Sequence, residues 1–134
     1  QCLDQLYAAI PDPEAPLGPE RATFYGRCPN TARAMFDHVN NCTGYYIAGL
    51  GAECDILPGC CATRLGALAA AEALPGFLDM SPHQAEDGEL WTPRKLLRRF
   101  LWHDRIHARA MFRRGRAKWG EQIPDPFGFA AQAS

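Results

Sequence analysis

Two of the four histidines in this sequence lie four residues apart, at His103 and His107. Residues at positions i and i+4 of a helix share one face. Two imidazoles on one face can supply two of the ligands of a divalent metal ion. His38 lies on the apolar stripe of a second predicted helix. If the two helices are neighbours, all three imidazoles point into one interior space. Three histidines leave one coordination position open, which is typical of a catalytic zinc site.

A metal ion in such a site would lower the pKa of a bound water toward neutrality, or hold a thiol as its thiolate. The alternative interpretation is that the histidines are hydrogen-bonded core residues, as a single histidine on an apolar face usually is. Three imidazoles on two apolar stripes, two of them one turn apart, favour metal binding. We therefore expect His38, His103 and His107 to bind one divalent metal ion.

Three residues that follow His38 are weaker candidates for the same site. Asn41 and Cys42 come three and four residues later, so they share its side of the helix. Cys42 could be a fourth ligand, or a small apolar residue of the core. Tyr45 lies a further turn along and could direct its hydroxyl toward charge that develops in the cavity. These three are the candidates for catalytic residues that the sequence offers.

Asp104 directly follows His103, and this dipeptide looks like the His-Asp pair of HD-type phosphohydrolases. Consecutive residues in a helix point about 100° apart, however, and no distant aspartate completes that pattern. We therefore expect Asp104 to pair with Arg99 or Arg105 on the outside of the helix.

The helix that carries His38 has start and stop signals in the sequence. Asn30 or Thr31 is a good N-cap, and Gly49 and Gly51 supply a stop, so the predicted helix ends at about residue 49. Its inward stripe has spacings of three and four residues and consists of Met35, His38, Cys42, Tyr45 and Gly49.

The helix that carries the histidine pair begins at Thr92-Pro93, an N-cap followed by proline at the first helical position. It should continue to Gly115 or Gly120. Its inward stripe consists of Leu96, Phe100, His103, His107 and Ala110.

The rest of the chain is predicted to connect and cover these helices. Residues 1–10 resemble the last turns of a helix, residues 10–30 are rich in proline and glycine, and residues 60–74 form an alanine-rich helix. Residues 75–90 read as an acidic surface loop that includes a solvated His83. The tail from Ile123 onward is irregular, with aromatic residues that attach it to the body. No segment alternates as strands do.

Composition places the chain among single globular domains. It has 134 residues, 47% hydrophobic residues and a net charge of −1, which argue against disorder. No run reaches about 18 consecutive apolar residues and the start lacks a secretory pattern, so we expect a cytoplasmic protein without a membrane segment. The first residue is Gln1 rather than Met, so the chain could be processed or a piece of a longer polypeptide.

Six cysteines could form a disulfide framework, but a chain of this length does not need one, and we expect reduced thiols. Cys54, Cys60 and Cys61 lack the paired short spacings of a structural zinc site.

Residues 94–118 carry ten Lys or Arg and a single acidic residue. A basic helix with aromatic residues nearby could bind nucleic acid or an anionic substrate. The isoelectric point near 6.5 argues against a dedicated nucleic-acid binder. We expect acidic loops of the same chain, or of a second subunit, to complement this face. Arginines near a metal cavity could also steer a carboxylate-bearing thiol or substrate.

The positions of the three histidines resemble a pattern found in a known protein superfamily. A histidine on the second helix, in the segment Thr31 to His38, and the pair His103 and His107 on the last helix resemble the DinB/YfiT-like superfamily of four-helix bundles. The resemblance covers about residues 30–118. It implies that these three positions bind a divalent metal, often zinc or nickel. Some members are thiol-dependent transferases or isomerases, and members are often dimers, so the resemblance allows a homodimer.

We therefore predict a single all-α domain over residues 1–134, a DinB-like four-helix bundle whose first helix is short or truncated. Residues 1–29 would hold the helix end and the connection, residues 30–119 the main helices, and residues 120–134 the tail. The predicted function is that of a metal-dependent transferase or hydrolase that binds zinc or nickel and acts on a small-molecule substrate or a low-molecular-weight thiol. The alternative is a non-enzymatic binding or stress-associated module with a structural histidine cluster and a basic partner-binding helix.

Overall fold

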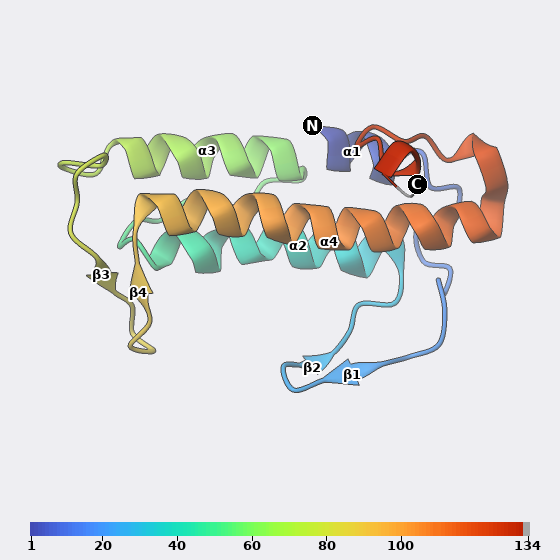
Figure 1. Cartoon of the computed structure of the whole chain (residues 1–134), viewed down its shortest axis with the longest axis horizontal. Helices are drawn as coiled ribbons and strands as arrows, with labels where there is room; N and C mark the ends of the chain where they lie inside the picture. Colours follow the sequence, from blue (N-terminus) through green and yellow to red (C-terminus); the bar gives the residue numbers. More distant parts are fainter. Residues whose placement is uncertain (133–134) are drawn as a thin grey trace. The chain divides into compact units, whose positions relative to one another are not determined.

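The computed structural model describes residues 1–132, and this part of the chain is mostly helical with two short strand pairs (Figure 1). Its α-helices are α1 (Cys2–Ala8), α2 (Ala32–Ala48), α3 (Cys60–Glu72) and α4 (Pro93–Trp119). The antiparallel pairs are β1 (Ala22–Thr23) with β2 (Gly26–Arg27), and β3 (His83–Gln84) with β4 (Leu90–Trp91). The helical content agrees with a helical bundle, whereas the strand pairs depart from the prediction. No helix among the described residues is long and apolar enough to cross a membrane.

Contacts divide the chain into two compact units. The first unit combines the residues up to His38 with those from Arg105 onward, and the second runs from Val39 to Asp104. Both divisions fall inside helices that are continuous, α2 and α4.

Side-chain caps explain why the two long helices begin where they do. The Thr31 hydroxyl accepts a hydrogen bond from the Ala34 N–H at 3.0 Å, and the Thr92 hydroxyl accepts one from the Lys95 N–H at 3.2 Å. Each bond satisfies one of the N–H groups that the first turn of a helix leaves without a partner. Both predicted starts are therefore confirmed.

Glycines decide where α4 ends. Gly120 has a φ of +76°, a left-handed conformation that ends the helix directly after Trp119. Gly115 lies inside α4 and does not end it. Its lack of a side chain instead allows Ile10 to lie close to the helix. A Cβ atom at Gly115 would lie 3.3 Å from Cδ1 of Ile10.

In the first unit, α1 and the start of α2 meet through aromatic packing. The rings of Tyr7 and Phe36 stack with their centroids 4.2 Å apart, and Leu3 and Leu6 of α1 are buried. The proline-rich connection is attached to α2 by the backbone, since the Arg33 N–H donates to the Pro13 carbonyl at 2.9 Å. This unit therefore has its own apolar core.

The tail packs on the C-terminal half of α4 within the same unit. It contains two short 3-10 turns, η1 (Gly120–Gln122) and η2 (Ala130–Gln132). Phe129 is buried, with its ring centroid 5.7 Å from that of Phe112, and the Asp125 carboxylate accepts hydrogen bonds from the N–H groups of Phe129 and Ala130, each at 2.8 Å. The aromatic attachment is as predicted. Residues 133–134 of the predicted tail lie outside the described residues.

The second unit is built around a hydrophobic cluster to which α2, α3, β4 and α4 all contribute. Two small residues of α3, Ala67 and Ala71, are fully buried in it, which is why an alanine-rich helix suits this position. The cluster contains Tyr46, Ile47, Leu50, Ala52, Ala67, Ala71, Trp91, Leu96 and Phe100. Residues 75–90 pack on this unit rather than forming only a solvated loop, since His83 Nδ1 lies 2.8 Å from the Gly49 carbonyl oxygen.

Candidate metal centre

Three side chains with metal-ligating atoms come together in this structure: His38, Cys42 and His103. One ligand atom from each lies within 4.8 Å of the other two, so the group could hold a metal ion. His38 and Cys42 are one turn apart on α2 and are half-buried, whereas His103 on α4 is only 4% exposed. Imidazole nitrogen and thiolate sulfur are ligands that zinc binds readily. The donor set therefore fits a divalent metal of this kind.

His107 lies beside His38 but is not one of these three residues. The two rings meet edge to face, with centroids 4.8 Å apart. The ligand set predicted from the sequence, His38 with His103 and His107, thus stays a prediction. Cys42, considered above as either a fourth ligand or a core residue, is the third member of the group that the structure brings together.

Burial shifts the pKa values of His38, His107 and Cys42. It lowers the pKa of His38, and together with the nearby His38 ring it lowers the pKa of His107 to about 4. Both imidazoles are therefore neutral at pH 7 and have a lone pair to donate. Burial raises the pKa of the Cys42 thiol, so Cys42 would release its proton only when a metal binds.

Tyr46, rather than Tyr45, packs against this group, and the predicted inward stripe is wrong at Tyr45. Tyr45 is 59% exposed, and its hydroxyl donates to the Asp87 carboxylate at 3.0 Å. That hydrogen bond is the main reason why the pKa of Tyr45 is raised. Asn41 is also exposed. Any catalytic role of these two side chains stays a prediction.

Tyr46 is a residue that the sequence reasoning missed. It is 8% exposed, and its ring meets the His103 ring edge to face at 5.4 Å. Burial raises the pKa of its hydroxyl. The spacing of the sequence could have indicated this position. Tyr46 follows Cys42 by four residues, just as Cys42 follows His38, so the three residues share one face of the helix.

The expected partner of Asp104 is wrong. Asp104 pairs with Arg64 of α3, at 2.9 and 2.8 Å, instead of with Arg99 or Arg105 of its own helix. Both of its oxygens accept hydrogen bonds from the guanidinium, so this carboxylate is held by an arginine and not aimed at the histidines. The arrangement gives no support to a His-Asp phosphohydrolase site.

The cysteines and the basic helix can be placed as well. Each of the six cysteines carries a thiol rather than a disulfide in the part of the chain that the structure describes.

Some basic residues of α4 pair with acidic residues nearby in the sequence. Glu89 lies 2.7 Å from Lys95 and 3.8 Å from Arg99, and Glu121 lies 2.9 Å from Arg116.

No protein-family model matches this sequence, and neither the curated proteins nor the solved structures gave a match.

Proposed function

We propose that this chain binds one divalent metal ion, zinc or nickel, and acts as a metal-dependent transferase or hydrolase of the DinB-like four-helix-bundle type, with a small thiol as ligand or co-substrate. The observation that carries the proposal is the convergence of ligand atoms from His38, Cys42 and His103 within 4.8 Å. The spacing of His103 and His107 on one face of α4 supports it independently.

The protonation states are compatible with metal binding. Two histidines with lowered pKa are neutral lone-pair donors at pH 7 and need no carboxylate to balance a charge. A thiol with a raised pKa is uncharged until a cation arrives. These groups can therefore lie together without charge in the metal-free protein.

The residues around the group would orient the ligands and exclude water. The Tyr46 ring packs against His103 and, with Trp91 and Phe100, belongs to the hydrophobic cluster of the second unit. A bound divalent ion would act as a Lewis acid and would favour the thiolate form of a small thiol. The protein would supply the ligands and a largely apolar wall on one side.

Metal analysis of the purified, untagged protein tests the site. We expect close to one divalent metal per chain, and we expect His103→Ala to lose it. His83→Ala is the matched control, since His83 is an exposed histidine on β3 outside the group. Undiminished metal in His103→Ala, or no metal in the parent protein under metal-replete conditions, would overturn the proposal.

Cobalt substitution distinguishes the two ligand sets. If Cys42 is a ligand, the cobalt protein shows a sulfur-to-cobalt charge-transfer absorption that Cys42→Ala abolishes, while His107→Ala retains it. If His107 is the third ligand instead, the parent cobalt protein lacks this absorption. His107→Ala then loses cobalt, and Cys42→Ala keeps it. Cys54→Ala, which removes another half-buried thiol, is the control.

The same cobalt spectrum tests the reaction class. An open coordination position predicts that free cysteine or glutathione shifts the visible bands as the thiol binds. A spectrum that does not respond to thiols, in a protein that holds cobalt firmly, would favour a structural metal and the non-enzymatic alternative.

A further inference from the structure

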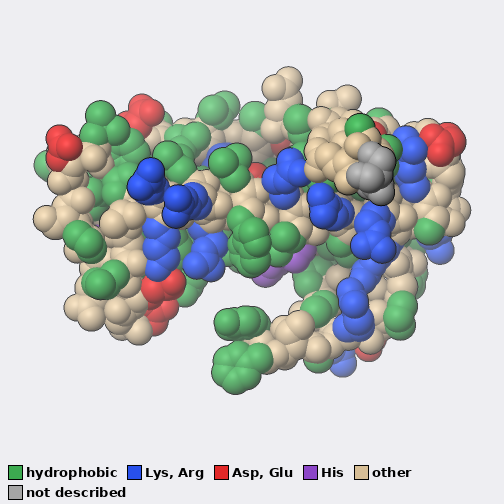
Figure 2. All heavy atoms as spheres, viewed as in Figure 1, with side chains coloured by type: hydrophobic (Ala, Val, Ile, Leu, Met, Phe, Trp, Pro, Cys, Tyr) green, Lys and Arg blue, Asp and Glu red, His purple; other side chains and the backbone are tan. Residues whose placement is uncertain are grey.

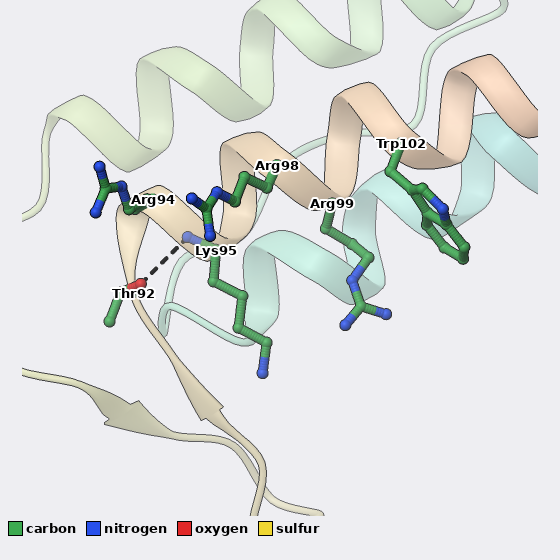
Figure 3. Close-up of a pocket in the computed structure, with 6 residues that line it drawn as sticks. All are labelled: Thr92, Arg94, Lys95, Arg98, Arg99 and Trp102. Atoms are coloured by element: carbon green, nitrogen blue, oxygen red, sulfur yellow. Dashed lines mark hydrogen bonds between the residues drawn. The ribbon is translucent and has the colours of Figure 1, made fainter.

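A pocket of about 570 Å³ lies at the start of α4, and none of the three metal-ligating residues lines it. Its walls come from the residue that caps α4 and from the first three turns of the helix (Figure 3). The lining residues are Thr92, Arg94, Lys95, Arg98, Arg99 and Trp102. Four of the six are cations, and Figure 2 shows basic side chains gathered over this part of α4. The pocket thus combines a hollow with a concentrated positive charge.

The cations of the pocket are only partly neutralised by the protein. Glu89 lies 2.7 Å from the Lys95 ammonium, which also donates to the Leu90 carbonyl at 2.6 Å. The same carboxylate lies 3.8 Å from Arg99. Arg94 and Arg98 make no ion pair within residues 1–132, and both are exposed. The ion pairs of Glu89 therefore reach only two of the four positive side chains.

This charge arrangement costs the isolated protein stability. The first turn of α4 contains no acidic residue, although the positive end of the helix dipole favours acidic side chains there. Arg94 and Arg98 are four residues apart, as are Lys95 and Arg99, and like charges at this spacing repel each other. An anion bound in the pocket would relieve both effects, because it would neutralise the cations and would interact favourably with the helix N-terminus.

Trp102 adds an apolar surface to the pocket. Its side chain is 53% exposed, and the Arg99 guanidinium lies 5.7 Å from the centre of its ring. An exposed indole beside a guanidinium group is suited to contact the organic part of a ligand whose charged part is held by the arginines.

We propose that this pocket binds a small phosphorylated molecule that carries two neighbouring phosphate charges, such as a diphosphate ester. Arg94 and Arg98 hold the phosphate oxygens, since a guanidinium matches them with paired N–H donors, and Lys95 and Arg99 contribute positive charge. Trp102 packs against the rest of the molecule. The pocket shares no residue with the metal group, so the proposed binding does not require the metal.

Titration of the full chain with inorganic pyrophosphate, followed by calorimetry, tests the proposal. We expect Arg94→Gln/Arg98→Gln to weaken binding by about tenfold or more, since two charge-assisted contacts are lost. Arg113→Gln/Lys118→Gln removes the same charge from exposed positions of α4 outside the pocket, and we expect it to change the affinity less than about twofold. Equal weakening by the two double variants would overturn the proposal, because it would indicate general attraction to a basic helix.

Thermal melts provide a second readout that does not require a tight ligand. Without pyrophosphate, Arg94→Gln/Arg98→Gln should melt at a higher temperature than the parent, because the repulsion in the first two turns is removed. With pyrophosphate the parent should gain stability and this variant should not. A parent that gains nothing at saturating pyrophosphate would overturn the proposal.

A single-stranded oligonucleotide is the competing ligand. If it binds with a steep salt dependence while pyrophosphate does not bind, the basic face is a nucleic-acid surface and the small-molecule site is overturned. Binding of pyrophosphate by the metal-free His103→Ala variant would show that the two sites are independent, as proposed.

Discussion

The guanidinium of Arg64 on α3 donates two hydrogen bonds to the carboxylate of Asp104 on α4, at 2.9 and 2.8 Å. Both side chains are largely shielded, at 14% and 28% exposure. The same guanidinium lies 3.8 Å from the centre of the Phe100 ring. A two-point ion pair with this planar contact fixes α3 against the part of α4 that carries His103 and follows the pocket arginines.

We expect Asp104→Asn or Arg64→Gln to lower the free energy of unfolding by about 2 kcal/mol, because each leaves a shielded charge without its partner. Urea denaturation of both single variants and of the double variant should give a coupling energy of about 1 kcal/mol or more. The pair of Arg116 with Glu121, in which Glu121 is 88% exposed, is the control and should couple by less than about 1 kcal/mol. Additive effects of Asp104→Asn and Arg64→Gln would contradict the assignment.

Gly49 should not tolerate a side chain. A Cβ atom there would lie 2.6 Å from the indole of Trp91, which is 1% exposed. We expect Gly49→Ala to destabilise the protein by about 1–3 kcal/mol, as overpacking of a core does. Gly66→Ala is the control, since Gly66 lies in α3 with nothing within 4 Å of its added Cβ and should gain about 0.5–1 kcal/mol. Thermal or urea unfolding measures both, and equal effects of the two variants would refute the close approach.

The stability of the metal-free protein should depend on His107 below neutral pH. The folded chain holds its pKa at about 4, whereas an unfolded histidine has a pKa of about 6.5. Between these values the unfolded chain takes up a proton that the folded chain does not. The free energy of unfolding should therefore fall as the pH falls from about 6.5 to 4, by about 2 kcal/mol once partial solvation is allowed for.

Urea denaturation between pH 7.5 and 4 measures this loss, and His107→Gln should flatten the profile. His38 contributes in the same direction, because burial lowers its pKa too. An unchanged profile in His107→Gln would show that His107 is not the group responsible.

Metal binding should stabilise the folded chain. At zinc concentrations about a hundred times the dissociation constant, the free energy of unfolding should rise by about 2.7 kcal/mol, since the ion binds the folded state in preference to the unfolded state. A chelator should reverse the rise in melting temperature. His103→Ala should show neither effect, while His83→Ala should show both. Equal stabilisation of His103→Ala by zinc would place the metal elsewhere.

Much of the fold could be predicted from short stretches of sequence. Thr31 and Thr92 mark the starts of α2 and α4, and Gly120 ends α4, because a cap or a left-handed glycine acts within one turn of its own position. The strand pairs escaped prediction for the opposite reason. Each strand is two residues long, too short for an alternating pattern, and it exists only through its pairing.

The candidate site was predicted in part. Helical periodicity alone places His38 with Cys42 on one side of α2 and His103 with His107 on one side of α4, since residues four apart share a face in any α-helix. Periodicity allowed both Tyr45 and Tyr46 as the next residue of the stripe. Packing selected Tyr46, because the cluster containing Trp91 and Phe100 covers that side of α2.

The sequence by itself determined which residues can act together within one helix, the caps that begin α2 and α4, and the charge that α4 carries. These depend on local geometry, which is the same wherever the helix lies. Only the tertiary structure decided that Cys42 of α2 joins His103 of α4, and that Asp104 pairs with Arg64. Such contacts join residues far apart in the chain, so they depend on how whole helices pack, which no local pattern of residues specifies.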